Sequence, residues 1–194
     1  MSDPLDCARE RIRAVIAGSP VPEDPRHAEN TVEWLLRLDP RADQALQLAA
    51  LAHDIERARP DRLRREDFAD YDAFKRAHAA RGAEMVRRIL TDCGVDEALV
   101  EETCRLVECH EFGGDARADR LREADSLSYF EVNLPLYYAR EGRDETLRRC
   151  RWGIRRLSPH GVALLRCLRM PTAELQDLLW AALVAEVPES ARET

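Results

Sequence analysis

The sequence places a histidine and an aspartate side by side, His53 and Asp54, at the end of the apolar run LAALAHDIERA, residues 48–58. Such a run normally lies inside a protein, where two adjacent titratable groups are costly to bury because they lose their hydration. Burial becomes favourable when a neutral imidazole and an ionised carboxylate bind the same divalent cation. The pair therefore suggests a metal site.

Four of the chain's five histidines lie on successive segments with helical periodicity. Residues three, four and seven apart share a helix face, and by this rule each histidine is aligned with small or apolar side chains. A single histidine on such a stripe is more often a hydrogen-bonded core residue. Several histidines and two aspartates together favour one shared cluster around cations. The candidate ligands are His27, His53, Asp54, His78, His110 and Asp125. The fifth histidine, in the segment SPHG, is expected in a turn outside the site; it is His160.

The pattern that must position these residues is helical nearly throughout, with few runs of β-branched residues. The third helix is expected to carry the His-Asp pair, and Pro135 should kink or end the sixth helix. The predicted helices cover about residues 5–17, 25–38, 42–57, 71–92, 96–111, 118–135, 143–156, 159–168 and 172–185. The expected fold class is an all-α bundle. We expect a single domain over residues 1–194, with a core at about 20–140 and C-terminal helices at about 143–186.

Composition limits the remaining classes. The chain has 194 residues, 45% of them apolar and 35% charged, as in a globular domain. A net charge of -7 argues against binding to nucleic acid polymers or anionic membranes. The longest apolar run, LLWAALVA, is too short to cross a bilayer, and it could cover the core or form a homodimer contact. The N-terminus lacks a basic-then-apolar signal, so we expect a cytoplasmic location with all six cysteines as free thiols.

The ordered set His27, His53-Asp54 and Asp125 resembles the signature of the HD superfamily of metal-dependent phosphohydrolases, a family of helical bundles. The extra histidines of its two-metal members are matched in KRAHAARGAEMV and LVECHEFGG, and LREADSLSYF looks like the closing motif. The resemblance covers about residues 25–132. It implies that one metal is held by His27, His53, Asp54 and Asp125, and that Asp54 bridges to a second metal held by His78 and His110. Imidazole and carboxylate ligands suit Fe, Mn, Co, Ni or Zn.

The resemblance implies hydrolysis of a small, anionic phosphorylated metabolite or nucleotide by a water that two cations activate. Lys75, the only lysine in the chain, could contact the phosphate, or it could be a solvated side chain. Glu111 could take part in proton transfer, or it could have a capping or surface role at a helix end. Arg57 and Arg59 could lie at the pocket mouth, although the neighbouring acids Glu56, Asp61, Glu66 and Asp67 favour a solvated loop. The basic segment LRRCRWGIRR could bind phosphate, but an exposed helix face is favoured.

Two other functions are compatible with the same residues. Some members of the superfamily with the additional histidines hold a di-iron pair and cleave a C–C or C–P bond with dioxygen. The third hypothesis is a binding or regulatory module that catalyses no reaction. It is disfavoured because none of the six candidate ligand residues is missing.

Overall fold

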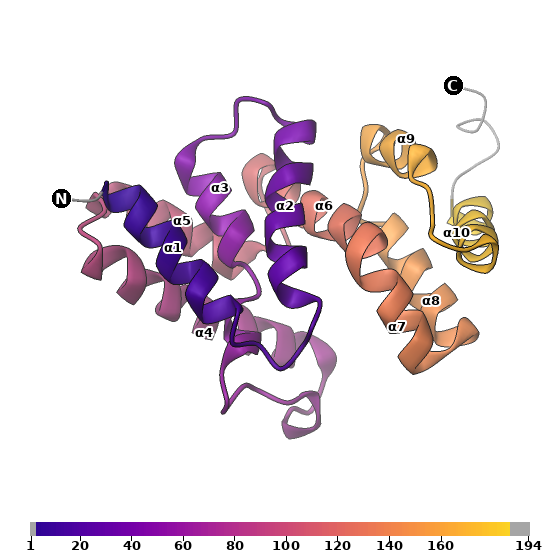
Figure 1. The fold of residues 1–194 in the computed structure, drawn as a ribbon, viewed down its shortest axis with the longest axis horizontal. Coiled ribbons are helices and arrows are strands. Elements are labelled where there is room, and N and C mark those ends of the chain that lie inside the picture. Colours follow the sequence, from indigo (N-terminus) through magenta and orange to yellow (C-terminus); the bar gives the residue numbers. More distant parts are fainter. Residues whose placement is uncertain (1–2, 187–194) are drawn as a thin grey trace. The chain divides into compact units, whose positions relative to one another are not determined.

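The computed structural model describes residues 3–186, and every regular element in that range is a helix (Figure 1). The expected all-α fold class is confirmed. The chain forms two compact units, one ending at Ala124 and the other beginning at Asp125. Within the described residues, no helix is both long enough and apolar enough to cross a membrane.

The first unit contains the candidate ligands from His27 to His110. Its α-helices are α1 (Pro4–Ile16), α2 (Asp24–Leu38), α3 (Gln44–Ala52), α4 (Tyr71–Asp92), α5 (Glu97–Cys109) and the first part of α6 (Ala116–Ser128). Two short 3₁₀ turns, η1 (Ile55–Ala58) and η2 (Arg65–Asp67), connect α3 to α4. Helix α3 packs against α2 and α5, and α4 packs along α5 and against η1. The site thus draws on helices that contact one another within this unit.

Aspartates begin two of these helices. Asp43 accepts a hydrogen bond from the Leu46 amide (3.1 Å) at the start of α3, and Asp70 accepts one from the Ala73 amide (2.6 Å) at the start of α4. These carboxylates satisfy amides that have no partner within the helix. Gly94 follows the end of α4 with φ +73°, a conformation that glycine adopts without steric cost.

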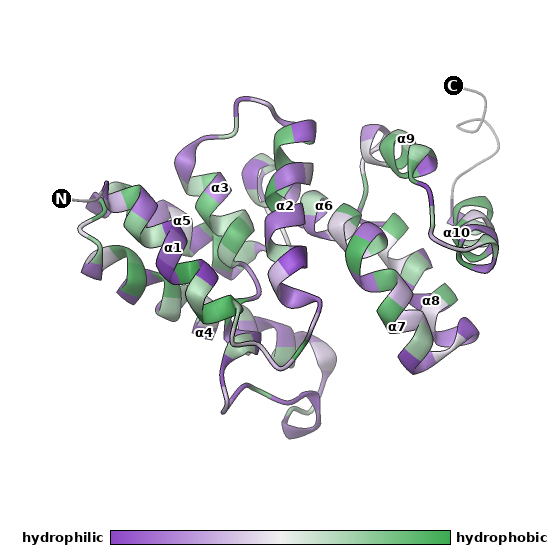
Figure 2. Cartoon of the chain, in the orientation of Figure 1, coloured by the Kyte–Doolittle hydropathy of each residue, from purple (hydrophilic) through white to green (hydrophobic). Residues whose placement is uncertain are grey.

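Helix α3 is the central apolar element of the first unit. Figure 2 shows it mostly in the hydrophobic colour, and its residues from Leu48 to Ala52 are all buried. The prediction that this helix continues to Arg57 is wrong. The α-helix ends at Ala52, His53 is its C-cap, and Asp54 (φ -101°, ψ 14°) leads into η1. The ring of His53 bonds to the carbonyl of Ala50, so the side chain takes a backbone acceptor of the last helical turn.

The second unit begins within α6 and continues as helices. A π-helical turn, η3 (Tyr129–Asn133), precedes α7 (Leu134–Glu141), α8 (Arg143–Ile154), α9 (Pro159–Cys167) and α10 (Ala173–Glu186). Helix α8 packs against α7 and α10. Pro135 lies in the first turn of α7, where a missing amide hydrogen is tolerated, so the α-helical conformation is interrupted before it as predicted. His160 is exposed, but it lies in the first turn of α9 rather than in a turn between helices.

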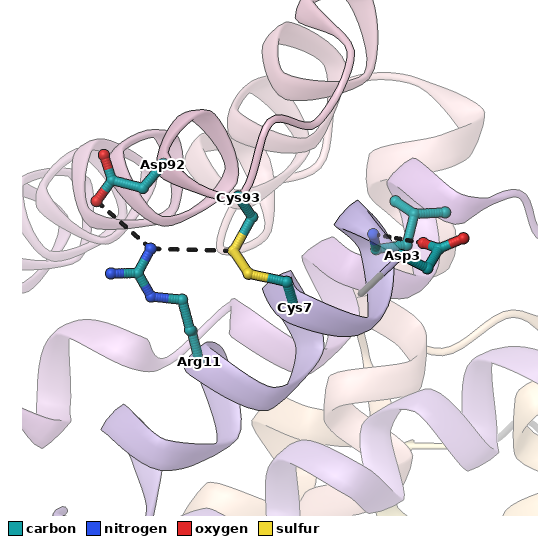
Figure 3. The surroundings of a disulfide bond; sticks show 6 residues. Asp3, Cys7, Arg11, Asp92 and Cys93 are labelled. Carbon is teal, nitrogen blue, oxygen red and sulfur yellow. Dashed lines mark hydrogen bonds and ion pairs between the residues drawn. A yellow bond between two sulfur atoms is a disulfide. The ribbon is translucent and has the colours of Figure 1, made fainter. Parts of the chain in front are cut away.

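A disulfide joins two of the cysteines that were expected to be free. Cys7 in α1 and Cys93 at the end of α4 are bonded across 86 residues of sequence (Figure 3). The side chain of Arg11 lies beside this bond, 3.9 Å from the Cys93 sulfur and 3.5 Å from a carboxylate oxygen of Asp92. The expectation of six free thiols is therefore wrong for this pair. The remaining cysteines are free thiols: Cys104, Cys109, Cys150 and Cys167.

Candidate metal centre

The histidines predicted to face the core do so. His27 and His78 are 3% and 4% exposed, and His53 and His110 are each 1% exposed. They come from α2, the C-cap of α3, α4 and the C-cap of α5. These elements therefore bring four imidazole rings into the interior of the first unit.

Two groups of these residues could hold a metal ion. In one group the ligand atoms of Asp54, His78 and His110 all lie within 4.8 Å of one another. In the other, the same limit holds for His27, His53 and Asp125, the residue of α6 that directly follows the boundary between the units. All six predicted residues thus belong to one group or the other.

Asp54 lies between the imidazoles of the first unit. Its Oδ1 atom is 3.0 Å from Nε2 of His78. Its Oδ2 atom is 3.7 Å from Nε2 of His53 and 3.9 Å from Nε2 of His27. The carboxylate therefore faces rings of both groups, which is the placement expected of a bridging ligand.

The opposite ring nitrogens fix the orientation of two of the imidazoles. Nδ1 of His53 lies 2.9 Å from the carbonyl oxygen of Ala50, and Nδ1 of His110 lies 2.6 Å from that of Val107. A carbonyl oxygen can only accept, so each Nδ1 carries the hydrogen. In its neutral form each ring then directs the lone pair of Nε2 away from the backbone and toward the candidate metal site. Metal-binding histidines commonly have this arrangement.

Burial and neighbouring charges shift the pKa values of the site residues in different directions. Burial opposes ionisation of Asp54, but the neighbouring charges of Arg57 and His53 and the hydrogen bond with His78 keep its pKa well below the usual range. Burial likewise lowers the pKa of His78, yet its bonds with Asp54 and Glu56 raise it to about 9. For His110, burial dominates and lowers the pKa to about 4. His110 is therefore neutral at pH 7, as a metal ligand must be.

Lys75 and Glu111 form an ion pair next to the histidines. Lys75 is buried on α4 and contacts the carboxylate of Glu111, whose Oε1 atom lies 3.7 Å from Nε2 of His110. The Lys75 ammonium also lies 5.1 Å from the ring centre of Tyr71. The alternative readings of a solvated lysine and a surface glutamate are thus wrong. Their roles in substrate binding or proton transfer stay predictions.

The segment after the His-Asp pair is less solvated than its alternating charges suggest. Arg57 donates to Oδ2 of Asp54 (2.7 Å) and forms an ion pair with the buried Asp24 (3.1 Å). Glu56 is buried and accepts from the ring of His78 at 3.0 Å. The expectation of a solvated loop is wrong at Glu56. The expectation of a solvated loop agrees better with Arg59, because Arg59 pairs with the exposed Asp61 at 2.7 Å.

Sequence reasoning missed Glu56 and Asp24 as residues around the site. Glu56 stands among arginines and acids in the sequence, so periodicity gives no sign that it is buried. Asp24 lies in the first turn of α2 next to Pro25, where an acid is usual because it faces the positive end of the helix dipole. The only sequence signal for these contacts was the presence of charged residues just after the His-Asp pair. Glu56 is the partner of His78, and Arg57 is the partner of Asp54.

The basic segment of α8 pairs with acids of its own unit. Arg151 and Arg155 lie 2.6 Å and 3.0 Å from the Glu186 carboxylate, and Arg148 pairs with Glu145. Arg148, Arg151 and Arg155 are exposed, in agreement with the helix face favoured from the sequence. Arg156 is not: its side chain is 9% exposed and lies 3.7 Å from a carboxylate oxygen of Asp125.

The donor set suits a transition metal. Imidazole nitrogens and carboxylate oxygens, without a thiolate, are the ligands that Mn, Fe, Co, Ni and Zn accept. The residues that would hold the ions are those of the two groups, with Asp54 facing both.

The fold and site define an all-helical protein with two histidine–aspartate groups that could hold metal ions. The chain belongs to the family described as "Domain of unknown function (DUF4202)", whose model matches residues 6–178. No curated protein and no solved structure matches the chain significantly.

Proposed function

We propose that this protein is a metal-dependent phosphohydrolase of the HD type, acting on a small phosphorylated metabolite or nucleotide. The observation that carries the proposal is the convergence of imidazole Nε2 atoms on the carboxylate of Asp54, at 3.0 Å for His78 and 3.7 Å for His53. Buried imidazoles around an ionised carboxylate form a ligand set for two divalent cations. Two such cations supply a water deprotonated near neutral pH and neutralise the charge of phosphoryl oxygens.

The basic side chains of the site favour a phosphate substrate over an uncharged one. Lys75 pairs with Glu111, and Arg57 pairs with Asp54, so positively charged side chains lie next to residues of the candidate site. Phosphoryl transfer depends mainly on positioning and on compensation of negative charge. Lys75 is assigned to hold a phosphoryl oxygen.

Glu111 is assigned to proton transfer. It is partly buried, 3.7 Å from Nε2 of His110, and next to the ammonium of Lys75. A carboxyl group at this place can carry a proton to the oxygen of the leaving group, while the contact with Lys75 orients it. A small anionic molecule is therefore the proposed partner, rather than a nucleic acid polymer.

The test begins with anaerobic purification and metal analysis, followed by assay of phosphate release from a panel of phosphomonoesters and nucleotides with added Mn²⁺. We expect metal-dependent phosphate release that does not consume dioxygen, and loss of this activity on chelation. A di-iron absorption spectrum that changes with substrate, together with no phosphate release, would instead establish the oxygenase reading. Asp54→Asn provides the inactive control in either case.

A further inference from the structure

We propose that Glu56 is a positioning residue that sets which ring nitrogen of His78 faces the metal site. The inference rests on the proposed metal-dependent function and concerns the ion at Asp54, His78 and His110. It extends the site to a carboxylate that belongs to neither ligand group.

The contacts of Glu56 and His78 carry this assignment. Oε2 of Glu56 lies 3.0 Å from Nδ1 of His78, and Nε2 of the same ring lies 3.0 Å from Oδ1 of Asp54. Glu56 is 1% exposed, and His78 is 4% exposed. An ionised carboxylate can only accept a hydrogen bond, so the hydrogen on the outer side of the ring belongs to Nδ1. Nε2, which donates to Asp54 in the metal-free chain, is then the nitrogen that releases its hydrogen when a cation binds beside Asp54.

Glu56 takes the place that a backbone carbonyl has for the other two rings. His53 and His110 are each at a helix C-cap and bond to the carbonyl three residues earlier. His78 lies within α4, where the carbonyls of the helix are already hydrogen-bonded along the helix axis. Its outer nitrogen therefore needs an acceptor from another element, and η1 supplies Glu56.

The second oxygen of Glu56 fixes the orientation of the carboxylate. Oε1 accepts from the amide of Leu63 at 2.9 Å and lies 3.4 Å from the guanidinium of Arg81. Both neighbours are donors. In a Glu56→Gln variant the amide oxygen therefore stays on the side of Leu63, and the amide NH₂ turns toward His78. Two donors would then face each other unless the hydrogen of His78 moves to Nε2, which removes the lone pair needed for the metal.

The experiment measures Co²⁺ binding to the metal-stripped full chain by calorimetry and by the visible absorption of Co²⁺. The wild type is expected to bind two ions. In Glu56→Gln one of the two affinities should fall about 10- to 100-fold, with a changed absorption spectrum for that ion, while the other affinity stays the same. His78→Gln sets the upper limit of the effect. The matched control is Glu102→Gln, which removes another ion-paired glutamate of the first unit and should leave both affinities unchanged.

The outcomes separate this inference from the proposed function. Two ions bound with wild-type affinities in a folded Glu56→Gln variant would overturn the role of Glu56 and leave the phosphohydrolase proposal standing. A wild type that binds no ion would overturn both. If Glu56→Gln loses its helical circular dichroism, Glu56→Asp is measured in its place. The shorter side chain keeps the negative charge but moves the acceptor away from His78. The same selective loss of one ion is therefore expected.

Discussion

Nε2 of His27 and Nε2 of His53 lie 3.2 Å apart in the interior of the first unit. Nδ1 of His53 donates to a backbone carbonyl, so Nε2 is the nitrogen of this ring that faces His27. Such a pair of buried nitrogens is stable when a proton or a cation lies between or beside them. Asp54 lies 3.7 Å from His53 and 3.9 Å from His27, so the two rings and the carboxylate form one cluster of possible ligands.

Replacing Asp54 by Ala should remove bound metal and activity while the helices remain. The carboxylate faces imidazoles of both ligand groups, so its loss weakens both ions at once, and metal content should fall from about two ions per chain to below one. Metal analysis by mass spectrometry and far-ultraviolet circular dichroism measure the two effects. Unchanged metal content in the folded variant would contradict the site. Asp61→Asn, at an exposed carboxylate, is the matched control and should retain its metal.

Lys75 and Glu111 should be energetically coupled. Each single substitution, Lys75→Met or Glu111→Gln, leaves the other side chain in a poorly solvated place without its partner, and should cost on the order of 3 kcal/mol of unfolding free energy. The double variant should be more stable than the sum of the two losses indicates, by on the order of 1 kcal/mol or more. Urea unfolding of the four proteins gives this coupling energy. Simple additivity would show that the contact contributes nothing specific.

The stability of the metal-stripped protein should fall as the pH rises above 6.5. His78 has a pKa of about 9 in the folded chain, above its ordinary value of 6.5, because its bonds with Asp54 and Glu56 outweigh the effect of burial. The folded state thus holds a proton that the unfolded state releases between these values. The stabilisation is complete below pH 6.5 and is lost as the pH approaches 9, by on the order of 3 kcal/mol. Chemical unfolding across this range, in the wild type and in His78→Gln, tests the slope; equal slopes would refute it.

Loss of the Cys7–Cys93 bond should destabilise the first unit without emptying the metal site. A bridge between residues 86 apart restricts the unfolded chain, which corresponds to on the order of 4 kcal/mol. Unfolding with and without reductant, and of Cys7→Ser, should show this loss at unchanged metal content. Cys167→Ser, at an exposed free thiol, is the control and should behave as the wild type. A reductant-insensitive wild type would mean that the bond does not stabilise the protein.

Helical periodicity was sufficient to predict the all-α class and the burial of the histidines. The stripe around His78 depends only on the regular spacing of α4, whose bounds of Tyr71 and Asp92 agree with those expected. The residue types indicated one cluster of candidate ligands, because neutral imidazoles and carboxylates share a core only where something compensates their polarity. The division of that cluster between two metals was implied by the resemblance to the HD superfamily.

The sequence could not reveal contacts made by irregular backbone. The end of α3 at Ala52 depends on how His53 and Asp54 are bonded in three dimensions, whereas the apolar pattern continues past them. The pairing of Cys7 with Cys93 depends on how α1 packs against α4, since nothing in their spacing marks them as partners. Glu56 was missed for the same reason, because its role depends on its contact with the ring of His78.

The backbone carbonyls that hold His53 and His110 have a consequence for how the site tolerates mutation. Every residue type supplies a main-chain oxygen, so no replacement at Ala50 or Val107 deletes the acceptor itself. His78 instead depends on one particular side chain, and a single codon change can abolish it. Random mutagenesis should therefore inactivate the centre more readily through the neighbour of His78 than through the neighbours of the other two rings.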